Sequence, residues 1–430
     1  MSRPDRKASA TVRTRLDNGL VVLARRNRAA RSIAVRMAFE AGSAFDPPGR
    51  AGLAALLAQL LDRGAGDQTG DEIAERFDAL GVAFLAQARR DSLDLEARFL
   101  PEHLAEVLAR LRLIASAPAF PETEVRRERE QMLTVLAERD QDTAEVAELA
   151  LSAALYPAGH PYHSPALGTP DSVGAIGRDD LVAHHRRRIG PRGAVLALAG
   201  DFDPAVLIEG AAAAFGSWPA GGPGETRAAI PEPPLPSGAR TIVKVLDGKS
   251  QSDIALGILP GVRRLSPDLQ PALVMNQILG EFSMGGRLGD AVREKGGLAY
   301  YARSHFAAGL GHGPLVVRAG VAPGSVSRAV VLIRRTLDLM RRRGPTTAEM
   351  RDAGQAMAAS LPRRLETNPG IVAFLAECEF QRLGPDYPDR LPDLIRAVTR
   401  EQVNEAAARY LDPARQVLVL AGPPAKETPR

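Results

Sequence analysis

Hydrophobic residues follow two periods along the chain, one typical of strands and one typical of helices. Residues 32–40 alternate between apolar and polar positions as a strand does, whereas residues 51–63 are apolar enough for a buried helix. The Asn18-Gly19 pair between two apolar runs predicts a hairpin, because this dipeptide favours the turn that joins antiparallel strands. The same patterns predict helices at 71–80, 101–115, 121–154, 181–188, 271–280, 324–342, 347–361, 369–383 and 388–409, and strands within 11–48, 82–98, 194–199, 241–246, 253–259, 306–322 and 416–421.

A repeat underlies this pattern. Residues 175–200 align without a gap on residues 397–422, at a constant offset of 222 (397 − 175), and both segments close on Leu-x-Leu-Ala-Gly. Self-similarity of this kind indicates two copies of one structural unit. We therefore predict an α+β protein made of two homologous α/β-sandwich halves, each an antiparallel-rich sheet packed with helices.

The length of 430 residues also favours two domains. The stretch 216–238 is dense in Gly and Pro, cannot hold a regular element and suits an extended linker. We place an N-terminal domain at 1–220, the linker at 221–238 and a C-terminal domain at 239–430. Two similar halves that face each other could enclose a cavity for a ligand.

Composition excludes several classes of protein. The net charge is only +4, and the arginines are interleaved with acidic residues while aromatic residues are few, so we expect no nucleic-acid partner. Cys378 is the single cysteine, which rules out an internal disulfide or a cysteine metal cluster. No apolar run reaches the roughly 18 residues of a membrane span. The first 15 residues contain no signal-peptide core, so the protein is either cytoplasmic or periplasmic after removal of a signal.

The stretch 281–301 holds the strongest candidate for a functional site. The Gly296-Gly297 pair can end a helix and start a strand, which would carry Arg293 and Tyr300 from one element to the next. A guanidinium and a phenol held near each other can bind a carbonyl or carboxylate of a substrate. In the alternative interpretation, Arg293 pairs with a local acid, either Glu281 or Asp290, and Tyr300 belongs to the core.

Several motifs together resemble one known family. They are 16–20 (LDNGL), 41–43 (AGS), 167–170 (LGTP), 199–203 (AGDFD), 286–288 (GRL) and 293–300 (REKGGLAY). The chain resembles the pitrilysin/insulinase type of zinc peptidases over nearly its whole length. Within that family it is similar to noncatalytic subunits, such as the alpha subunit of the mitochondrial processing peptidase and bacterial two-subunit relatives.

The resemblance implies a zinc motif, His-x-x-Glu-His, on the first helix, and this chain departs from it. The two His positions are Ala55 and Gln59, the Glu position is Ala58, and the position of a further Glu ligand on a later helix falls near Val135. None of these residues supplies the imidazole or carboxylate ligands that zinc requires. We therefore expect no metal and no cofactor in this chain.

The seven histidines offer no replacement for the zinc ligands. His160 and His163 lie in an expected loop without a nearby Glu at helical spacing, and we expect them to be satisfied or exposed. His184 and His185 are adjacent, so they point to different faces of a helix.

By resemblance, Arg293 and Tyr300 act as catalytic and substrate-binding residues in trans, at a zinc held by a homologous partner subunit. This predicts a noncatalytic, substrate-binding subunit of a heterodimeric zinc metallopeptidase, inactive alone, with peptide substrates that add as a strand to a sheet edge of the partner. Gly285 and Gly286 would belong to a substrate-binding loop, or form a plain turn at a helix N-terminus. A structural core-type subunit and a standalone peptide-binding protein remain as alternatives.

Overall fold

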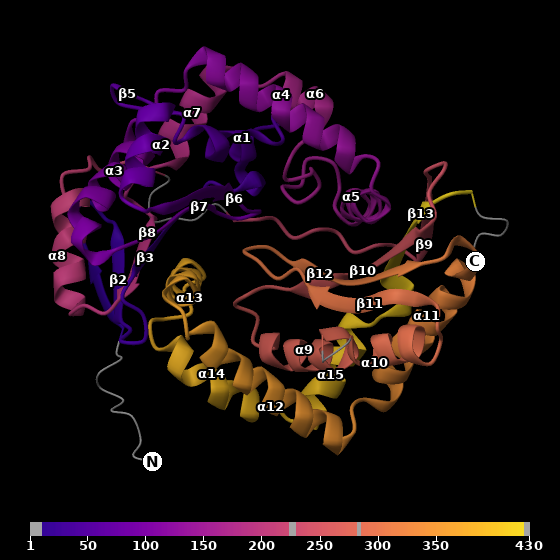
Figure 1. Ribbon diagram of the computed structural model, residues 1–430. Coiled ribbons are helices and arrows are strands. Elements are labelled where there is room, and N and C mark those ends of the chain that lie inside the picture. Colours follow the sequence, from indigo (N-terminus) through magenta and orange to yellow (C-terminus); the bar gives the residue numbers. More distant parts are fainter. Residues whose placement is uncertain (1–10, 223–228, 282–284, 425–430) are drawn as a thin grey trace. The chain divides into compact units, whose positions relative to one another are not determined.

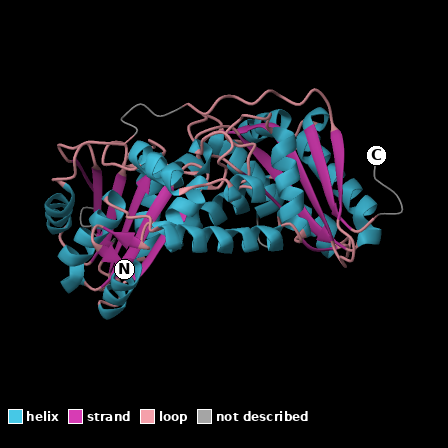
Figure 2. Cartoon of the chain, turned by 90° about the horizontal axis from the view of Figure 1, so that it is seen from above, coloured by secondary structure: helices cyan, strands magenta, loops and turns pink. Residues whose placement is uncertain are grey.

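The computed structural model describes residues 11–222, 229–281 and 285–424, which form two compact units (Figure 1). The first unit comprises the chain up to Leu136, the segment that begins at Pro165, and Leu361–Asp389. The second comprises Ala137–Ser164, the segment Ala229–Ser360, and the chain from Arg390 onward. In both units helices flank a central sheet (Figure 2).

The sheet of the first unit has six strands in the order β1-β2-β8-β3-β7-β6. Every neighbouring pair is antiparallel except β2 and β8, which are parallel. The predicted hairpin is present, and Gly19 in its turn has a φ of 94°, a value that glycine adopts without strain. The strands are β1 (Val12–Arg15), β2 (Val21–Arg26), β3 (Ile33–Phe39), β6 (Ala83–Ala88), β7 (Leu93–Phe99) and β8 (Val195–Gly200), beside a small ribbon of β4 (Gly64–Ala65) and β5 (Gln68–Thr69).

Helices cover both faces of this sheet. Most of them pack on the face that carries the side chains of Val22, Val35 and Leu196, which form the main core of the unit. They are α1 (Leu53–Leu60), α2 (Gly70–Ala79), α3 (Leu104–Ser116), α4 (Glu122–Arg139), α6 (Pro170–Gly174), α7 (Arg178–Arg188) and α8 (Pro204–Phe215). The opposite face, with Leu23 and Ala197, packs against α13 (Asn368–Phe380).

The sheet of the second unit has five strands in the order β11-β12-β10-β13-β9, with β13 and β9 as its parallel pair. The strands are β9 (Arg240–Val245), β10 (Ser252–Val262), β11 (Ala299–Phe306), β12 (Gly313–Val321) and β13 (Gln416–Gly422). The helices are α5 (Thr143–Leu155), α9 (Leu269–Asn276), α10 (Gly286–Gly289), α11 (Val326–Arg343), α12 (Thr347–Arg364, shared with the first unit at its end), α14 (Tyr387–Arg396, also shared) and α15 (Arg400–Tyr410).

The strand registers confirm the repeat. Val195 of β8 pairs with Val21 of β2, and Val417 of β13, which follows Val195 by the predicted offset, pairs with Arg240 of β9. In the same way, β3 pairs antiparallel with β7 in the first sheet, and β10 pairs antiparallel with β12 in the second. The two sheets therefore share one topology, and β2, β3, β6, β7 and β8 correspond to β9, β10, β11, β12 and β13. The predicted fold class, two homologous halves that each pack a sheet with helices, is confirmed.

Each half of the sequence contributes one helix to the sheet of the other half. Helix α5 precedes β8 in the chain yet packs on β10 and β13, and its Leu151 and Leu155 lie where a side chain on Gly257 would be. Helix α13 follows β12 yet packs on β8 and β3. Both assignments are visible in Figure 1, where α5 lies against the second sheet and α13 against the first. A single cut in the sequence therefore does not separate the two compact units.

The helix predicted at 121–154 is two helices, α4 and α5, which belong to different units. The second begins at Thr143 and is capped by Asp142, whose carboxylate accepts hydrogen bonds from the N–H groups of Ala144 and Glu145, both within 2.9 Å. Such a cap satisfies donors that are free only at a helix start. The chain thus turns at 140–142 because an N-cap residue is available there.

Helix α8 was not predicted, although the sequence holds its start signal. Asp203 caps it through the N–H of Ala205, and Pro204 occupies the first helical position. The chain after it, within the Gly- and Pro-rich stretch, is anchored by Trp218, which is buried against Phe39 and Phe215.

Within the described residues, no helix combines the length and the apolar character needed to cross a membrane.

Candidate functional site

The positions that correspond to the zinc motif lie on helices of the first unit. Asp46 fixes the start of α1 by accepting hydrogen bonds of 2.9 Å from the N–H groups of Gly52 and Ala54. Ala55 and Ala58 are buried in the core of the unit, whereas Gln59 is exposed.

Val135, the position of the further ligand, lies on α4 with 43% of its surface exposed. Two methyl groups, one amide and one isopropyl group offer a single weak oxygen donor, whereas a protein zinc site needs three or four nitrogen, sulfur or carboxylate ligands. These residues do not fit a zinc ion. No cluster of three or more His, Cys, Asp or Glu with metal-ligand geometry occurs elsewhere among the described residues.

The histidine pair at 160 and 163 has a structural role. The Nε2 of His160 lies 3.1 Å from the carbonyl oxygen of Pro231, and its Nδ1 accepts from the N–H of Tyr162 at 3.0 Å. The Nδ1 of His163 lies 2.8 Å from the carbonyl oxygen of Tyr156. Both rings therefore bind backbone groups, as expected for satisfied histidines.

His184 is buried on α7, and this environment controls its charge. Burial, followed by the positive charges of Arg188 and Arg187, lowers the pKa of His184 from 6.5 to about 4. The neutral ring is thus favoured in the fold, while the unfolded chain takes up a proton already near pH 6.5. The free energy of unfolding should therefore fall by up to roughly 3 kcal/mol as the pH drops from about 6.5 to about 4.

Urea denaturation at a series of pH values measures this loss. The variant His184→Leu removes the titrating group and should lose correspondingly less stability over the same interval. Identical pH profiles of the variant and the unaltered chain would contradict the prediction.

Gly285 and Gly286 start helix α10 in backbone conformations that favour glycine, with φ values of 110° and 54°. A side chain on Gly285 would approach the carbonyl oxygen of Ala302 to 2.2 Å, and one on Gly286 would approach that of Ile278 to 2.4 Å. The pair therefore allows the helix start to pack against β11 and against the π-helical segment η4 (Gln277–Glu281). The part of the predicted loop at 282–284 lies outside the described residues.

Tyr300 lies in a β-bulge at the start of β11. Ala299 pairs with Val321 of β12, and Tyr301 pairs with the next residue, Gly320, so Tyr300 is the additional residue on its strand. Its side chain is 87% exposed. A bulge changes the direction of a side chain, and bulges are common beside active sites. This exposure excludes the alternative that Tyr300 belongs to the core. The corresponding strand of the first unit, β6, pairs with β7 without a bulge.

Tyr301, by contrast, points inward. Its hydroxyl donates a hydrogen bond of 2.6 Å to Oδ1 of Asp253, a buried carboxylate that also accepts from Thr143 at 2.5 Å and from Gln251 at 3.0 Å. Burial, reinforced by the Asp253 carboxylate, raises the pKa of Tyr301 well above its usual range. This anchor fixes the start of β11 and with it the position of the exposed Tyr300.

Arg293 belongs to the π-helical segment η5 (Asp290–Glu294) and lines a cavity of about 650 Å³ in the second unit. Its Nε lies 3.4 Å from an oxygen of the adjacent Glu294, and a third of its side chain is exposed. It does not pair with Glu281 or Asp290, the two acids considered above; Asp290 binds Lys295 at 2.6 Å instead. The helix ends as predicted at Gly296-Gly297, where Gly297 has a φ of 61°.

The cavity is basic. Arg293 shares it with residues from the strands and from η4, and Arg303 and Arg318 lie opposite each other on β11 and β12. Arg318 forms an ion pair with Glu148 of α5. The further lining residues are Gly280, Glu281, Gly285, Tyr301, Ala302, Ser304 and His305. Among the described residues, Glu281 is the single acidic residue that lines this cavity, and desolvation raises the pKa of its carboxyl group. Such a site suits a ligand with carbonyl or carboxylate oxygens.

The structure brings some predicted residues together and separates others. Arg293 and Gly285 line the same cavity, and Tyr300 adjoins its wall through Tyr301 without being part of it. The positions of the zinc motif lie in the other unit. Arg303 and Arg318 were not predicted, although the alternation of β11 from Tyr301 places Arg303 on the same side of the strand.

Two family models match the chain, in an order that follows its two halves. The model "Insulinase (Peptidase family M16)" matches residues 21–169, and "Peptidase M16 inactive domain" matches residues 175–357. Together they account for most of the sequence. The chain belongs to peptidase family M16, the pitrilysin/insulinase family, as the sequence motifs predict.

Individual relatives agree with this assignment. The chain is similar to "Non-peptidase homolog YmxG" of Helicobacter pylori, with 26% identity over 86% of this chain and 84% of the relative. It is 25% identical to "Uncharacterized zinc protease YmxG" of Bacillus subtilis, over 94% and 97% of the two chains. A crystal structure of a peptidase M16 inactive domain from Pseudomonas fluorescens superposes with a TM-score of 0.90 at 27% identity, covering 97% of this chain and 99% of that one.

Proposed function

We propose that this chain is the noncatalytic, substrate-binding subunit of a heterodimeric zinc metallopeptidase. In this proposal a homologous partner holds the zinc and the general base, and this chain supplies Arg293 and Tyr300. The first part rests on Ala55, Ala58, Gln59 and Val135, which cannot bind the metal of the family. One relative is named a non-peptidase homolog, in agreement with this part.

The observation that carries the second part is the bulge at Tyr300. A tyrosine held at 87% exposure beside a basic cavity contributes little to the stability of its own unit, so its position needs another reason. A phenol O–H and a guanidinium N–H can both donate to the oxyanion of a tetrahedral intermediate. Arg293 in the cavity wall and Tyr300 at its border present these two kinds of donor on adjoining elements.

The proposal leads to a reconstitution experiment. The purified chain should hydrolyse no fluorogenic peptide and should retain no stoichiometric zinc after dialysis, measured by atomic absorption. A tagged version should co-purify with a homologue that contains His-x-x-Glu-His, and mixing the two should give peptidase activity that a chelator removes. Chelator-sensitive hydrolysis by the chain alone would overturn the first part, and a stable pair without activity would overturn the second.

A further inference from the structure

Two arginines lie directly opposite each other in the wall of the cavity that contains Arg293. Arg303 of β11 is paired with Arg318 of β12 in the strand register, and both line the cavity. Directly opposite residues have Cβ atoms about 5 Å apart, and two like charges at such positions destabilise a sheet. The pair therefore lowers the stability of the second unit, and its presence needs another reason.

The first unit shows that the fold does not require this pair. The matching registers place Glu96 of β7 at the position of Arg318. Leu85 of β6, opposite Glu96, occupies the position of Arg303. The carboxylate of Glu96 lies 3.5 Å from the guanidinium of Arg36. The same two positions thus hold an apolar and an acidic side chain in one unit, and two basic side chains in the other.

The charges of the two arginines are balanced to different degrees. Arg318 has a fifth of its side chain exposed and forms an ion pair with Glu148 of α5. Arg303 is exposed, and its guanidinium lies 5.7 Å from the centre of the Tyr301 ring. An aromatic ring attracts a cation without neutralising it. Within the described part of the chain no carboxylate forms an ion pair with Arg303, so its charge is available to a ligand.

The two arginines belong to the sheet face on which α5 packs. Asp253 accepts hydrogen bonds from Thr143 of α5 and from Tyr301, so the Tyr301 side chain lies on that face. Arg303 is two residues further along β11 and shares this side of the strand. Helix α5 packs mainly on β10 and β13, and the cavity lies beside it over β11 and β12. Its volume of about 650 Å³ is in the range of ligand pockets and suits a few residues of a peptide.

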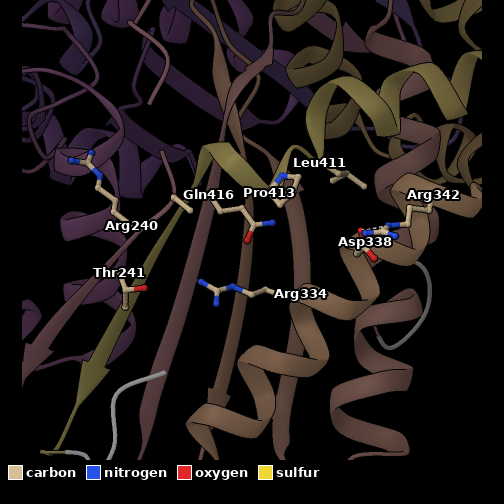
Figure 3. Close-up of a pocket in the computed structure, with 9 residues that line it drawn as sticks. Arg240, Thr241, Arg334, Asp338, Arg342, Leu411, Pro413 and Gln416 are labelled. Carbon is tan, nitrogen blue, oxygen red and sulfur yellow. Dashed lines mark hydrogen bonds and ion pairs between the residues drawn. The ribbon is translucent and has the colours of Figure 1, made fainter. Parts of the chain in front are cut away.

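Another pocket of the second unit also contains arginines, but in a different state. It has a volume of about 500 Å³ and lies between β9 and α11 (Figure 3). Arg342 in this pocket donates a hydrogen bond of 2.8 Å to Asp338, one turn earlier on the same helix. This guanidinium already has a carboxylate partner inside its pocket, so a substitution of Arg342 is a suitable control for one of Arg303.

We propose that Arg303 is a specificity-determining residue, which binds a carboxylate of the peptide substrate in the cavity that contains Arg293. The inference rests on the proposed function, because it assigns the carboxylate to a peptidase substrate. The bound carboxylate lies against Arg303, with Arg318 as a second positive charge, and relieves the repulsion between the two guanidinium groups. With Arg293 at the scissile bond, this carboxylate belongs to an acidic side chain within a few residues of that bond or to the C-terminus of the substrate. Both present the same group to a guanidinium.

Four labelled peptides test the ligand class and separate its two sources. Each is a decapeptide of alanine and serine with a neutral fluorophore on its N-terminus, with Glu or Gln at its centre and a free or amidated C-terminus. In fluorescence anisotropy with the purified chain, the preferred peptide should bind about tenfold more tightly than the Gln amide, which has no carboxylate. Tighter binding of the Glu amide than of the Gln acid assigns the site to a side chain, and the reverse order assigns it to the C-terminus.

Variants of the chain assign the preference to a residue. Arg303→Leu, which copies Leu85 of the first unit, should remove the preference for a carboxylate, and Arg303→Gln gives the same test if the first variant fails to fold by circular dichroism. Arg342→Leu removes a positive charge from the other pocket and should leave the preference unchanged. An undiminished preference in folded Arg303→Leu or Arg303→Gln, an equal loss in Arg342→Leu, or equal binding of all four peptides by the unaltered chain would each overturn the proposal.

Hydrolysis by the reconstituted pair distinguishes this inference from the proposed function. The preferred peptide should be cleaved with a kcat/KM about tenfold above that of the Gln amide, and Arg303→Leu should cancel this difference mainly through KM. Hydrolysis without any preference for a carboxylate overturns this inference and leaves the proposed function in place. A preference in binding without hydrolysis by the pair overturns the proposed function and leaves the ligand class of the cavity in place.

Discussion

Replacing Arg293 by alanine should lower the turnover number of the reconstituted peptidase by a factor of about 10² to 10³. The reason is that a donor to the developing oxyanion contributes mainly in the transition state, so kcat should fall far more than KM rises. Tyr300→Phe, which removes one hydroxyl and keeps the ring, should lower kcat in the same direction. Initial rates over a range of peptide concentrations, with the partner in excess, separate kcat from KM.

Lys295→Ala is the matched control for this experiment. Lys295 lies two residues from Arg293, is 76% exposed and binds Asp290 outside the cavity. Its replacement should leave kcat and KM within about twofold of the unaltered pair, since exposed ion pairs contribute little. Retention of full activity in both Arg293→Ala and Tyr300→Phe would refute their assigned roles, while the subunit could still assemble with its partner.

Gly285→Ala should destabilise the second unit by about 3 kcal/mol. Two effects add: an L-residue is strained at a φ of 110°, and its Cβ would lie 2.2 Å from the carbonyl oxygen of Ala302. Gly297→Ala is the control, because Gly297 also has a positive φ of 61° but no atom lies within 4 Å of its Cβ position. That variant should cost only about 1 kcal/mol.

Urea denaturation followed by circular dichroism measures both losses. If Gly285→Ala were as stable as Gly297→Ala, the close packing of the α10 start against β11 would be refuted. The comparison also bears on function. If Gly285 is needed only for packing, any effect of its replacement on peptide binding is a consequence of unfolding.

Much of the fold was predictable from local patterns. The helix at 51–63, the two strands within 82–98 and the last strand at 416–421 are confirmed, because each is long, strongly periodic or bounded by clear turn residues. The repeat predicted two similar units. It could not show which sheet α5 and α13 join, because an apolar helix face does not by itself specify the sheet on which it packs, and only the tertiary structure decides.

The candidate functional site was only partly predictable from the sequence. The absence of zinc ligands follows directly from Ala55, Ala58 and Gln59, since the chemistry of these residues is independent of the fold. The exposure of Tyr300 was not predictable, because it depends on a bulge, and the sequence around Ala299-Tyr300-Tyr301 contains no glycine or other residue within the strand that marks one.

The position of α13 has a consequence for synthesis. A ribosome completes the six strands of the first sheet once residue 200 has been made, but α13 begins only at Asn368. During the intervening translation, the face with Leu23, Ala34, Val195 and Ala197 lacks the helix that buries it. Exposed apolar strands of this kind are prone to aggregate. The nascent chain should therefore depend on chaperones that bind during translation, until nearly the whole sequence has emerged.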